Sequence, residues 1–196
     1  MDIRNFFFRY RGYLPIPIAL ILILQSNLTL SSVIKGSILI ILGEALRIWA
    51  VRSAGGRTRT RKVGANTLCT WGPYAYVRNP LYIGNTIIYI GFILFADGKY
   101  IIPIFIIGIL YIFTQYYSII KLEEETLEKI FHEEYLDYKK NVPAFIPRLK
   151  QWKKITPSYY SWKNVLKAEK STIFVIILLI TVLLLKELII NTISNA

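Results

Sequence analysis

Aromatic and acidic side chains gather in two short stretches of the sequence, and together they suit a cationic ligand. The first stretch, residues 66–82, carries Tyr74 and Tyr82 among glycine and prolines, and the second places Glu123 beside Glu124. Aromatic faces attract cations through the ring quadrupole, and a carboxylate accepts hydrogen bonds from an ammonium group or from ribose hydroxyls. S-adenosylmethionine presents a sulfonium, an ammonium and a ribose together, so methyl transfer is one candidate among several.

The same two stretches also have a purely structural interpretation, as an aromatic belt beside a solvated acidic run. Other kinds of site are excluded more firmly. The chain has one cysteine, Cys69, and one histidine, His132, so it can form no internal disulfide and no zinc site built from His and Cys ligands. No P-loop and no G-x-G-x-x-G motif occurs, so a Rossmann-type nucleotide site is not indicated. We expect no bound metal.

The elements that must position these residues are apolar helices. The chain of 196 residues is 54% apolar and only 18% charged. Five runs are nearly free of charge, and each is close to the roughly 17–25 residues that cross a bilayer: 13–30, 33–51, 81–96, 100–120 and 171–190. They lack the polar stripe that a soluble helix shows to water. The sequence therefore predicts an all-α, polytopic membrane bundle of about five transmembrane helices, with a cofactor pocket at its cytoplasmic face.

The net charge of +12 could indicate nucleic-acid binding, but the positions of the basic residues argue against it. Of the 24 Lys and Arg residues, 20 lie in residues 4–11, 52–78 and 121–170, which share one side if the chain crosses at each apolar run. This is the positive-inside pattern, so we expect a multi-pass protein with a cytoplasmic N-terminus and cytoplasmic basic loops. Anionic headgroups of the lipid bilayer account for the charge, and no nucleic-acid partner is expected.

The polar turn at residues 96–99 predicts a hairpin between the third and fourth apolar helices. Gly84 and Gly91 lie seven residues apart on one face of the third helix and suit close helix packing. Because the hairpin returns to its own side, residues 66–82 and 121–127 should meet at the cytoplasmic surface.

The remaining helices are predicted in the same way. Residues 25–32 form a polar turn between the first two apolar runs, and the leader before them suits the membrane interface. The fourth helix is predicted to continue unbroken to Asn141, since only Gly108 interrupts its pattern. Glu44 and Arg47, one turn apart in the second helix, form either a functional pair or a structural salt bridge.

Two motifs resemble those of a known family. The stretch Asn-Thr-Leu-Cys-Thr-Trp-Gly-Pro-Tyr-Ala-Tyr-Val-Arg-Asn-Pro-Leu-Tyr-Ile-Gly at 66–84 is similar to the cofactor loop of the isoprenylcysteine carboxyl methyltransferases and related phospholipid methyltransferases. Their pattern there is glycine-x-tyrosine followed by Arg-His-Pro-x-Tyr-x-Gly. The second motif is equally similar and reads Glu123-Glu124-x-x-Leu127, Phe131-x-x-Glu134-Tyr135-x-x-Tyr138, Val142-Pro143 and Ile146-Pro147. We interpret residues 1–196 as one membrane-embedded methyltransferase domain, with its motif-bearing core at 66–147 and an extra C-terminal transmembrane helix at 171–190.

The resemblance implies an S-adenosylmethionine-dependent methyltransferase whose substrate, a membrane lipid or a prenylated compound, enters from the bilayer. Carried over by position, the cofactor contacts are Asn66, Thr67, Leu68, Cys69, Tyr74, Asn79, Pro80, Leu81 and Tyr82, with Glu123 closing the site. Arg78 is the candidate for an anion contact, to the cofactor's carboxylate or a lipid phosphate, or else it anchors headgroups. Glu124 either orients Arg78 or faces water.

Three departures from the family pattern bear on the substrate. Asn79 replaces a histidine, and its amide can donate a hydrogen bond but cannot carry a charge. Ile119 stands where the prenylcysteine enzymes place an arginine that holds the substrate carboxylate. We therefore expect an acceptor other than a free α-carboxylate, unless Arg47 or Arg78 reaches the same place. The extra C-terminal helix lies beyond the point where those enzymes end.

Two other functions remain open. One is a non-enzymatic membrane scaffold or transporter component, and the other is a membrane sterol-type reductase that uses a nicotinamide cofactor. Only a methyltransferase should bind S-adenosylmethionine.

Overall fold

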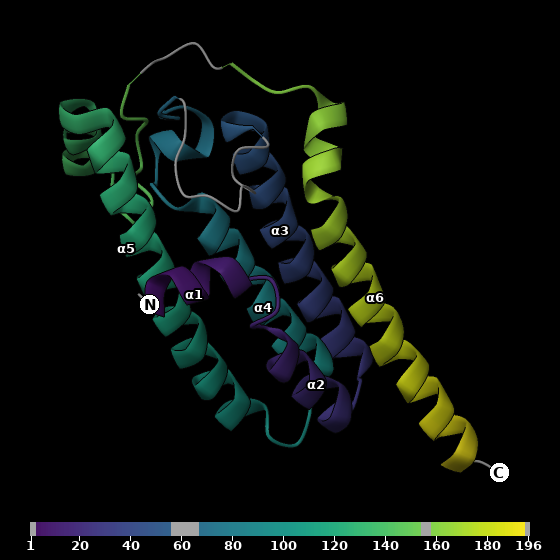
Figure 1. The fold of residues 1–196 in the computed structure, drawn as a ribbon. Coiled ribbons are helices and arrows are strands. Elements are labelled where there is room, and N and C mark those ends of the chain that lie inside the picture. Colours follow the sequence, from purple (N-terminus) through teal and green to yellow (C-terminus); the bar gives the residue numbers. More distant parts are fainter. Residues whose placement is uncertain (1–2, 56–66, 154–157, 195–196) are drawn as a thin grey trace.

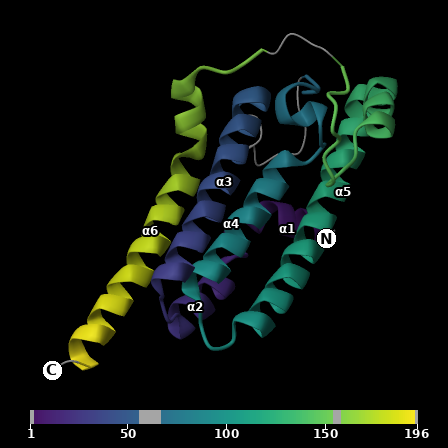
Figure 2. The ribbon, with the colours of Figure 1, turned by 180° about the vertical axis from the view of Figure 1, so that it is seen from behind.

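The computed structural model describes residues 3–55, 67–153 and 158–194, and all regular structure in these ranges is helical. The helices are α1 (Ile3–Tyr10), α2 (Ile16–Gln25), α3 (Leu30–Ala54), α4 (Pro80–Ala96), α5 (Ile101–Asn141) and α6 (Trp162–Ser194), with a short 3-10 helix η2 (Gly72–Ala75). Helices α3, α4 and α6 run side by side, α5 stands on the other side of α4, and α1 lies across α5 (Figures 1 and 2). The predicted all-helical fold is confirmed for the described residues.

Helices α3 and α4 form the closest pair because glycines face each other at two levels. A Cβ added to Gly84 would lie 2.9 Å from the carbonyl oxygen of Gly43, and one added to Gly36 would lie 2.7 Å from that of Gly91. Small residues let two helix backbones approach in this way. The close packing predicted from the spacing of Gly84 and Gly91 is confirmed, and its partner is α3.

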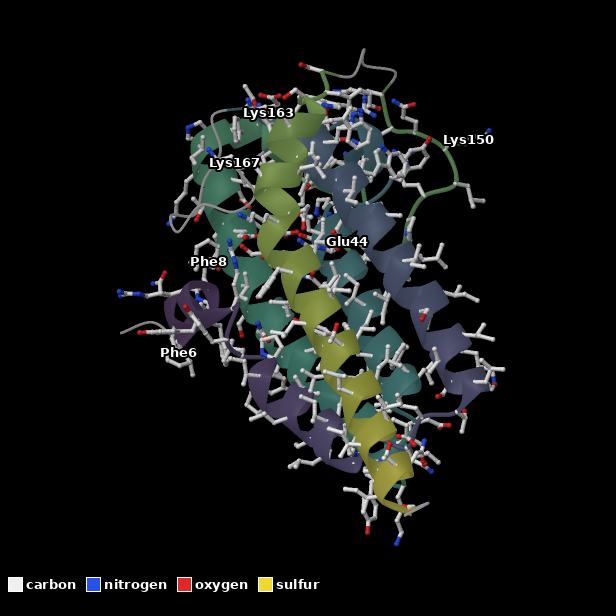
Figure 3. All side chains as sticks on the ribbon, turned by 90° about the vertical axis from the view of Figure 1, so that its right-hand side faces the viewer. Phe6, Phe8, Glu44, Lys150, Lys163 and Lys167 are labelled. Atoms are coloured by element: carbon white, nitrogen blue, oxygen red, sulfur yellow. The ribbon has the colours of Figure 1, made fainter. Side chains whose placement is uncertain are left out.

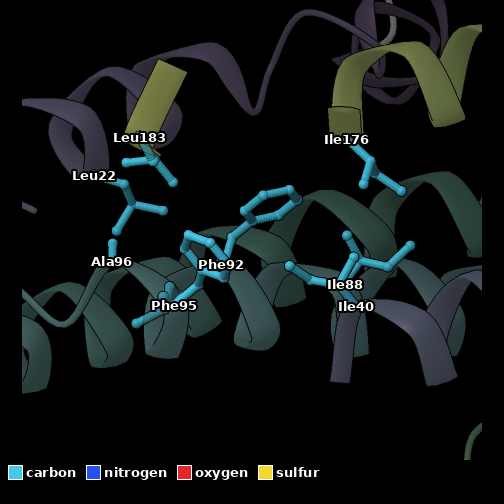
Figure 4. Packing of buried hydrophobic residues seen from close by; sticks show 9 residues of the cluster. Leu22, Ile40, Ile88, Phe92, Phe95, Ala96, Ile176 and Leu183 are labelled. Carbon is cyan, nitrogen blue, oxygen red and sulfur yellow. The ribbon is translucent and has the colours of Figure 1, made fainter. Parts of the chain in front are cut away.

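The main apolar core joins four helices and includes the C-terminal one. Figure 4 shows side chains of α2, α3, α4 and α6 meeting in this core: Leu22, Ile40, Ile88, Phe92, Phe95, Ala96, Ile176 and Leu183. Leu183 of α6 is fully buried there. The extra C-terminal helix is thus an integral part of the bundle, and it begins at Trp162, well before the predicted apolar run.

Two of the described helices, α5 and α6, are long and apolar enough to cross a membrane. Helix α4 is apolar but has 17 residues, and α3 has 25 residues that include Lys35, Glu44, Arg47 and Arg52. Helix α2 has 10 residues, which rise about 15 Å, whereas the hydrocarbon core is about 30 Å thick. The membrane character is supported, but the bundle of five spans is not confirmed.

Within the predicted first apolar run, 13–30, the helix α2 covers only Ile16–Gln25. Pro15 and Pro17 have no backbone N–H to donate, so the helix begins only at Ile16, and it ends at Gln25, where Ser26 takes extended backbone angles. The chain does reverse before α3, as predicted, but α2 packs mainly on α4 and α6 (Figure 1).

The hairpin between α4 and α5 is confirmed, with Asp97 in the left-handed region at φ 42°. The unbroken fourth helix is wrong at one residue, because His132 has φ 45° and ψ −122°. Such a conformation costs a non-glycine residue roughly 1–3 kcal/mol. The kink redirects the last turns of α5, where Tyr135 and Tyr138 are buried, whereas Ile130 before the kink is exposed. The sequence around His132 contains no proline or glycine that would predict the kink.

The irregular segments 67–79 and 142–153 lie at one end of the bundle, and the turns at 26–29 and 97–100 lie at the other (Figure 1). Lys150, Lys163 and Lys167 are near the end that holds the irregular segments (Figure 3). Which side of the membrane that end faces stays a prediction.

Candidate functional site

The segment 67–79 is held by backbone hydrogen bonds to the segment that follows α5. The amide of Arg78 donates to the carbonyl of Pro143 at 2.9 Å, and the amide of Arg148 donates to that of Tyr76 at 2.9 Å. A third bond, 3.1 Å long, runs from the amide of Trp152 to the carbonyl of Ala75. The two motif stretches, far apart in the sequence, are therefore in direct contact.

Glycine is required where this loop rests on the end of α3. Gly72 has φ +59°, and a Cβ at this position would lie 2.1 Å from Oγ of Ser53. The left-handed backbone and the close approach both favour glycine. Beside it, Nε1 of Trp71 is buried and has no hydrogen-bond partner among the described residues. The loop thus holds a buried donor without a hydrogen-bond partner in the part of the chain that the structure describes.

Arg78 ties the loop to α5. Its Nε donates to Oε1 of Glu124 at 3.0 Å, and its Nη2 lies 2.9 Å from the same oxygen. Its Nη1 donates to the carbonyls of Lys139 at 2.9 Å and Val142 at 2.6 Å. The side chains of Arg78 and Glu124 are only 12% and 15% exposed. Glu124 is thus paired with Arg78, whose Nε and Nη1 donate to protein oxygens while its Nη2 lies at ion-pair distance from Glu124.

The neighbouring carboxylate has looser partners. The hydroxyl of Tyr82 donates to Oε1 of Glu123 at 2.9 Å, and Nη1 of Arg11 lies 3.7 Å from that oxygen. Burial raises the pKa of Glu123 to about 7, against the opposing effects of the Tyr82 hydrogen bond and the Arg11 charge. Glu123 lies beyond the apolar run that ends at Ile120, so this carboxylate stands at the border of the membrane segment and is partly accessible.

Tyr74 and Cys69 are neutral groups within the same junction. The carbonyl of Tyr74 accepts a hydrogen bond from the hydroxyl of Tyr138 at 2.8 Å. Burial raises the pKa of the Tyr74 hydroxyl, and the nearby Cys69, Tyr138 and Glu123 add to the shift. Burial also raises the pKa of the Cys69 thiol to about 12, so it is a thiol and not a reactive thiolate at neutral pH.

The other predicted contacts are distributed around this junction. Leu68 is packed with Tyr135, Tyr138 and Val142, next to the loop–α5 contact. The side-chain amide of Asn79 donates to the carbonyl of Ala144 at 3.2 Å, and Pro80 begins α4 in a buried position. Leu81 is half-buried and Thr67 is exposed. Asn66 lies outside the described residues.

Sequence reasoning missed the main partner of Arg47. Its Nη2 donates to both carboxylate oxygens of Glu169 at 2.9 and 2.7 Å, and to Oγ1 of Thr172 at 3.2 Å. Its Nη1 bonds the side-chain oxygen of Asn85 on α4, and the predicted partner Glu44 lies 3.5 Å from its Nε. Glu169 is completely buried. Since Glu169 is 122 residues away in the sequence, no local spacing could have indicated this pair.

Sequence reasoning also missed that the N-terminal helix reaches the site. Arg4 of α1 lies 2.8 Å from both carboxylate oxygens of Glu125 on α5. Phe8 is buried in a cluster with Ile119, and Phe6 is exposed on the outer side of α1 (Figure 3). The guanidinium of Arg11 lies 4.2 Å from the ring centre of Phe8. The leader was expected only to lie along the membrane interface, and its basic and aromatic composition was the available signal.

Comparison with known proteins adds an independent result. Residues 31–134, just over half of the chain, match the family model described as phospholipid methyltransferase. The protein-S-isoprenylcysteine O-methyltransferase of Rattus norvegicus is 35% identical over 122 residues, which are 59% of this chain and 41% of the rat protein. The corresponding protein of Saccharomyces cerevisiae is 29% identical over 122 residues, 58% of this chain and 48% of the yeast protein.

A bacterial metal-resistance protein matches a similar share of this chain. The cobalt-zinc-cadmium resistance protein CzcN of Cupriavidus metallidurans is 29% identical over 103 residues, 53% of this chain and 43% of that protein. The match thus spans roughly two fifths to one half of the length of these curated relatives. No solved structure matches. The matched range 31–134 includes the first motif and the acidic pair of the second, and the chain belongs to the phospholipid methyltransferase family.

Proposed function

We propose that this protein is an S-adenosylmethionine-dependent methyltransferase that acts on a membrane-embedded lipid or prenylated substrate at the cytoplasmic membrane face. The observation that carries the proposal is the junction of the two motifs, where Tyr82 of α4 meets Glu123 of α5 at 2.9 Å. Family membership supports the chemistry, and the apolar helices α5 and α6 support the membrane location.

The residues at the junction fit S-adenosylmethionine in charge and in hydrogen-bonding capacity. Glu123 offers a partly accessible carboxylate for a cationic or hydroxyl-bearing group. Tyr74 and Tyr82 offer aromatic faces, and Nε1–H of Trp71, which has no partner among residues 3–55, 67–153 and 158–194, is a donor for a ligand acceptor. When bound, S-adenosylmethionine supplies a methyl group that its sulfonium has already activated. Together with Asn66, Thr67, Leu68, Cys69, Asn79, Pro80 and Leu81, these residues are the proposed binding set.

In this proposal the chain contributes positioning rather than acid–base chemistry. Holding two reacting groups in line and away from water supplies roughly 7–11 kcal/mol of the barrier reduction in well-oriented reactions. No general base is assigned, because a carboxylate acceptor needs none and an amine acceptor must arrive unprotonated. We assign Arg78 and Glu124 a positioning role, since their ion pair and the two carbonyl contacts fix the loop on α5.

The acceptor is proposed as an amphiphile because the outer face of α5 is apolar and exposed. Leu110 and Phe113 are 61% and 62% exposed there, which suits contact with lipid chains. The similarity to isoprenylcysteine O-methyltransferases supports a prenylated substrate. The similarity to a bacterial metal-resistance protein does not point to the same substrate. We therefore propose the substrate class and not one compound.

The test is a transfer assay with purified protein, radiolabelled methyl donor and a total membrane extract. We expect label in the organic phase with the wild-type protein and a strong loss of label with Glu123→Gln. Glu133→Gln, an exposed carboxylate on the same helix, is the control and should behave as wild type. Binding of a nicotinamide cofactor without binding of S-adenosylmethionine would instead favour a reductase. Binding of neither would favour the non-enzymatic scaffold.

A further inference from the structure

We propose that the C-terminal helix α6 holds the methyl-donor site in shape, and that Glu169 does this by fixing Arg47 against the start of α4. This inference rests on the proposed function and goes beyond it, because Glu169 lies outside the matched range 31–134. Glu169 is a positioning residue. It acts on the donor through Arg47 and Asn85 and does not touch the donor itself.

Glu169 and Arg47 form a buried ion pair between α6 and α3. Nη2 of Arg47 donates to the two carboxylate oxygens of Glu169 at 2.9 and 2.7 Å, and to Oγ1 of Thr172 at 3.2 Å. Glu169 has no exposed surface, and Arg47 is only 7% exposed. A charge held away from water is costly unless a partner of opposite charge stays in contact with it. The orientation of the Arg47 guanidinium therefore depends on α6.

The same guanidinium meets the part of the first motif that begins α4. Nη1 of Arg47 donates to the side-chain oxygen of Asn85, and a Cβ added to Gly84 would lie 2.6 Å from Cγ of Arg47. Tyr82, a proposed donor contact, lies one turn before Asn85 on the same helix. The Arg47 charge also counteracts the rise in the pKa of Tyr74, so it acts on the loop as well. Arg47 thus connects α6 to the proposed donor-binding residues.

The segment before α6 supports the end of α3 by separate contacts. The amide of Tyr160 donates to the carbonyl of Arg52 at 2.9 Å, and the Arg52 guanidinium lies 4.9 Å from the ring centre of Tyr159. Gly55 leaves room for the Tyr160 ring, since a Cβ there would lie 2.2 Å from it. The loop 67–79 rests on the opposite side of the same α3 end (Figures 1 and 2). Helix α3 therefore transmits the position of α6 to the loop.

The test is a double-mutant cycle on donor affinity, measured by calorimetry with S-adenosylhomocysteine. Glu169→Gln leaves Arg47 without its closest carboxylate and should lower the affinity by roughly tenfold. Arg47→Met should lower it at least as much. Because Glu169 acts through Arg47, adding Glu169→Gln to Arg47→Met should cause no further loss.

Thermal unfolding of the same variants separates positioning from a purely structural role. Arg47→Met leaves the Glu169 carboxylate buried without its cation, whereas the double variant removes both charges. The unfolding midpoint of the double variant should therefore rise above that of Arg47→Met, while its donor affinity stays low. A purely structural pair would recover both together. Thr172→Val is a milder change at the same guanidinium and should lower the affinity about twofold to threefold.

The matched control is Glu187→Gln on the same helix. The Glu187 carboxylate accepts a hydrogen bond from the amide of Leu28 at 3.2 Å, at the end of the bundle away from the loop. This variant should bind S-adenosylhomocysteine as wild type does.

Four results would overturn the inference. The first is wild-type affinity in Glu169→Gln or, where that variant does not fold, in Thr172→Val. The second is a double variant that regains wild-type affinity together with stability. The third is a double variant whose loss is the sum of the two single losses, which would make Glu169 independent of Arg47. The fourth is an equal loss in Glu187→Gln. Failure of the proposed function is separate, since the wild-type protein would then bind no S-adenosylhomocysteine at all.

Discussion

Glu123 and Glu124 are adjacent in the sequence, yet their surroundings differ in kind. Glu124 is 15% exposed and is bonded by Arg78, which also grips two carbonyls at the end of α5. Glu123 is 28% exposed and meets one tyrosine hydroxyl and a more distant guanidinium. The Glu124 carboxylate is closely paired within the protein, whereas the Glu123 carboxylate has a more distant cationic partner that a ligand can replace.

Two adjacent residues therefore differ in role: one fixes the loop on α5, and the other is the proposed ligand contact. The Glu124 side of α5 fixes the loop 67–79, and the Glu123 side presents charge toward Tyr82 and the N-terminal segment. Burial raises the pKa of Glu123, because the hydrogen bond from Tyr82 and the charge of Arg11 offset the effect of burial only partly.

The largest effect is expected from breaking the Arg78 clamp. Arg78→Met keeps most of the length of the side chain but leaves the Glu124 carboxylate and the carbonyls of Lys139 and Val142 without their donor. Removing one partner of a largely buried pair costs about 3–5 kcal/mol. We expect a clear fall in the thermal unfolding midpoint together with loss of methyl transfer. Lys153→Gln, which breaks an exposed pair with Asp137, is the control. Equal unfolding midpoints for the two variants would show that the contacts of Arg78 do not stabilise the fold.

The second effect is a pH dependence of cofactor affinity that belongs to Glu123. Three groups set its pKa besides burial: Tyr82 on α4 and Arg11 on the N-terminal segment lower it, and Glu124 on α5 raises it. The ionised form is needed to bind a cation, so affinity for S-adenosylhomocysteine should rise as the pH rises from 5.5 and level off above about 7. Below the pKa the loss approaches about tenfold per pH unit.

Two variants sharpen that titration. Arg11→Gln removes a charge that lowers the pKa of Glu123, so the midpoint of the curve should move to higher pH. Glu123→Gln should flatten the curve between pH 5.5 and 8. A pH dependence that survives unchanged in Glu123→Gln would assign the titration to another group.

The smallest effect is expected from Tyr82→Phe. This change removes one hydroxyl donor to Glu123 and keeps the ring and its packing against Tyr116. A single hydrogen bond to a charged group contributes about 1.5–3 kcal/mol, and water can replace part of it at a partly exposed carboxylate. We therefore expect a fall in cofactor affinity of roughly threefold to tenfold by calorimetry, with little change in unfolding. Complete loss of binding would mean that Tyr82 itself is a principal contact.

Local patterns in the sequence predicted several features of the fold. The turn at 96–99 predicted the hairpin between α4 and α5, and the spacing of Gly84 and Gly91 predicted close helix packing. Both signals are local, and both features are observed. The predicted meeting of residues 66–82 with residues 121–127 followed from the same hairpin, and it is seen in the Arg78–Glu124 and Tyr82–Glu123 contacts. The apolar run 13–30 is longer than the helix within it, because Ser26 takes extended backbone angles and α2 ends at Gln25.

Features that depend on distant partners could not be predicted in this way. The kink at His132 lies in a stretch with no proline or glycine. It is associated with the packing of Tyr135 and Tyr138 against Leu68 of the loop, which local sequence does not reveal. The same holds for Glu169, whose partner Arg47 belongs to another helix. Arg11 lies close to Glu123 only because α1 docks on α5.

The most direct test of the account compares Glu123→Gln with Glu124→Gln in the same preparations, by titration with S-adenosylhomocysteine and by thermal unfolding. Glu123→Gln should lose roughly tenfold or more in affinity. Its unfolding midpoint should be at or above that of wild type, because the variant removes a carboxylate whose ionisation the surrounding protein disfavours. Glu124→Gln should lower the unfolding midpoint and change the affinity of the folded protein less. Equal affinities for Glu123→Gln and wild type, with a lowered midpoint instead, would contradict the assignment of Glu123 to the ligand.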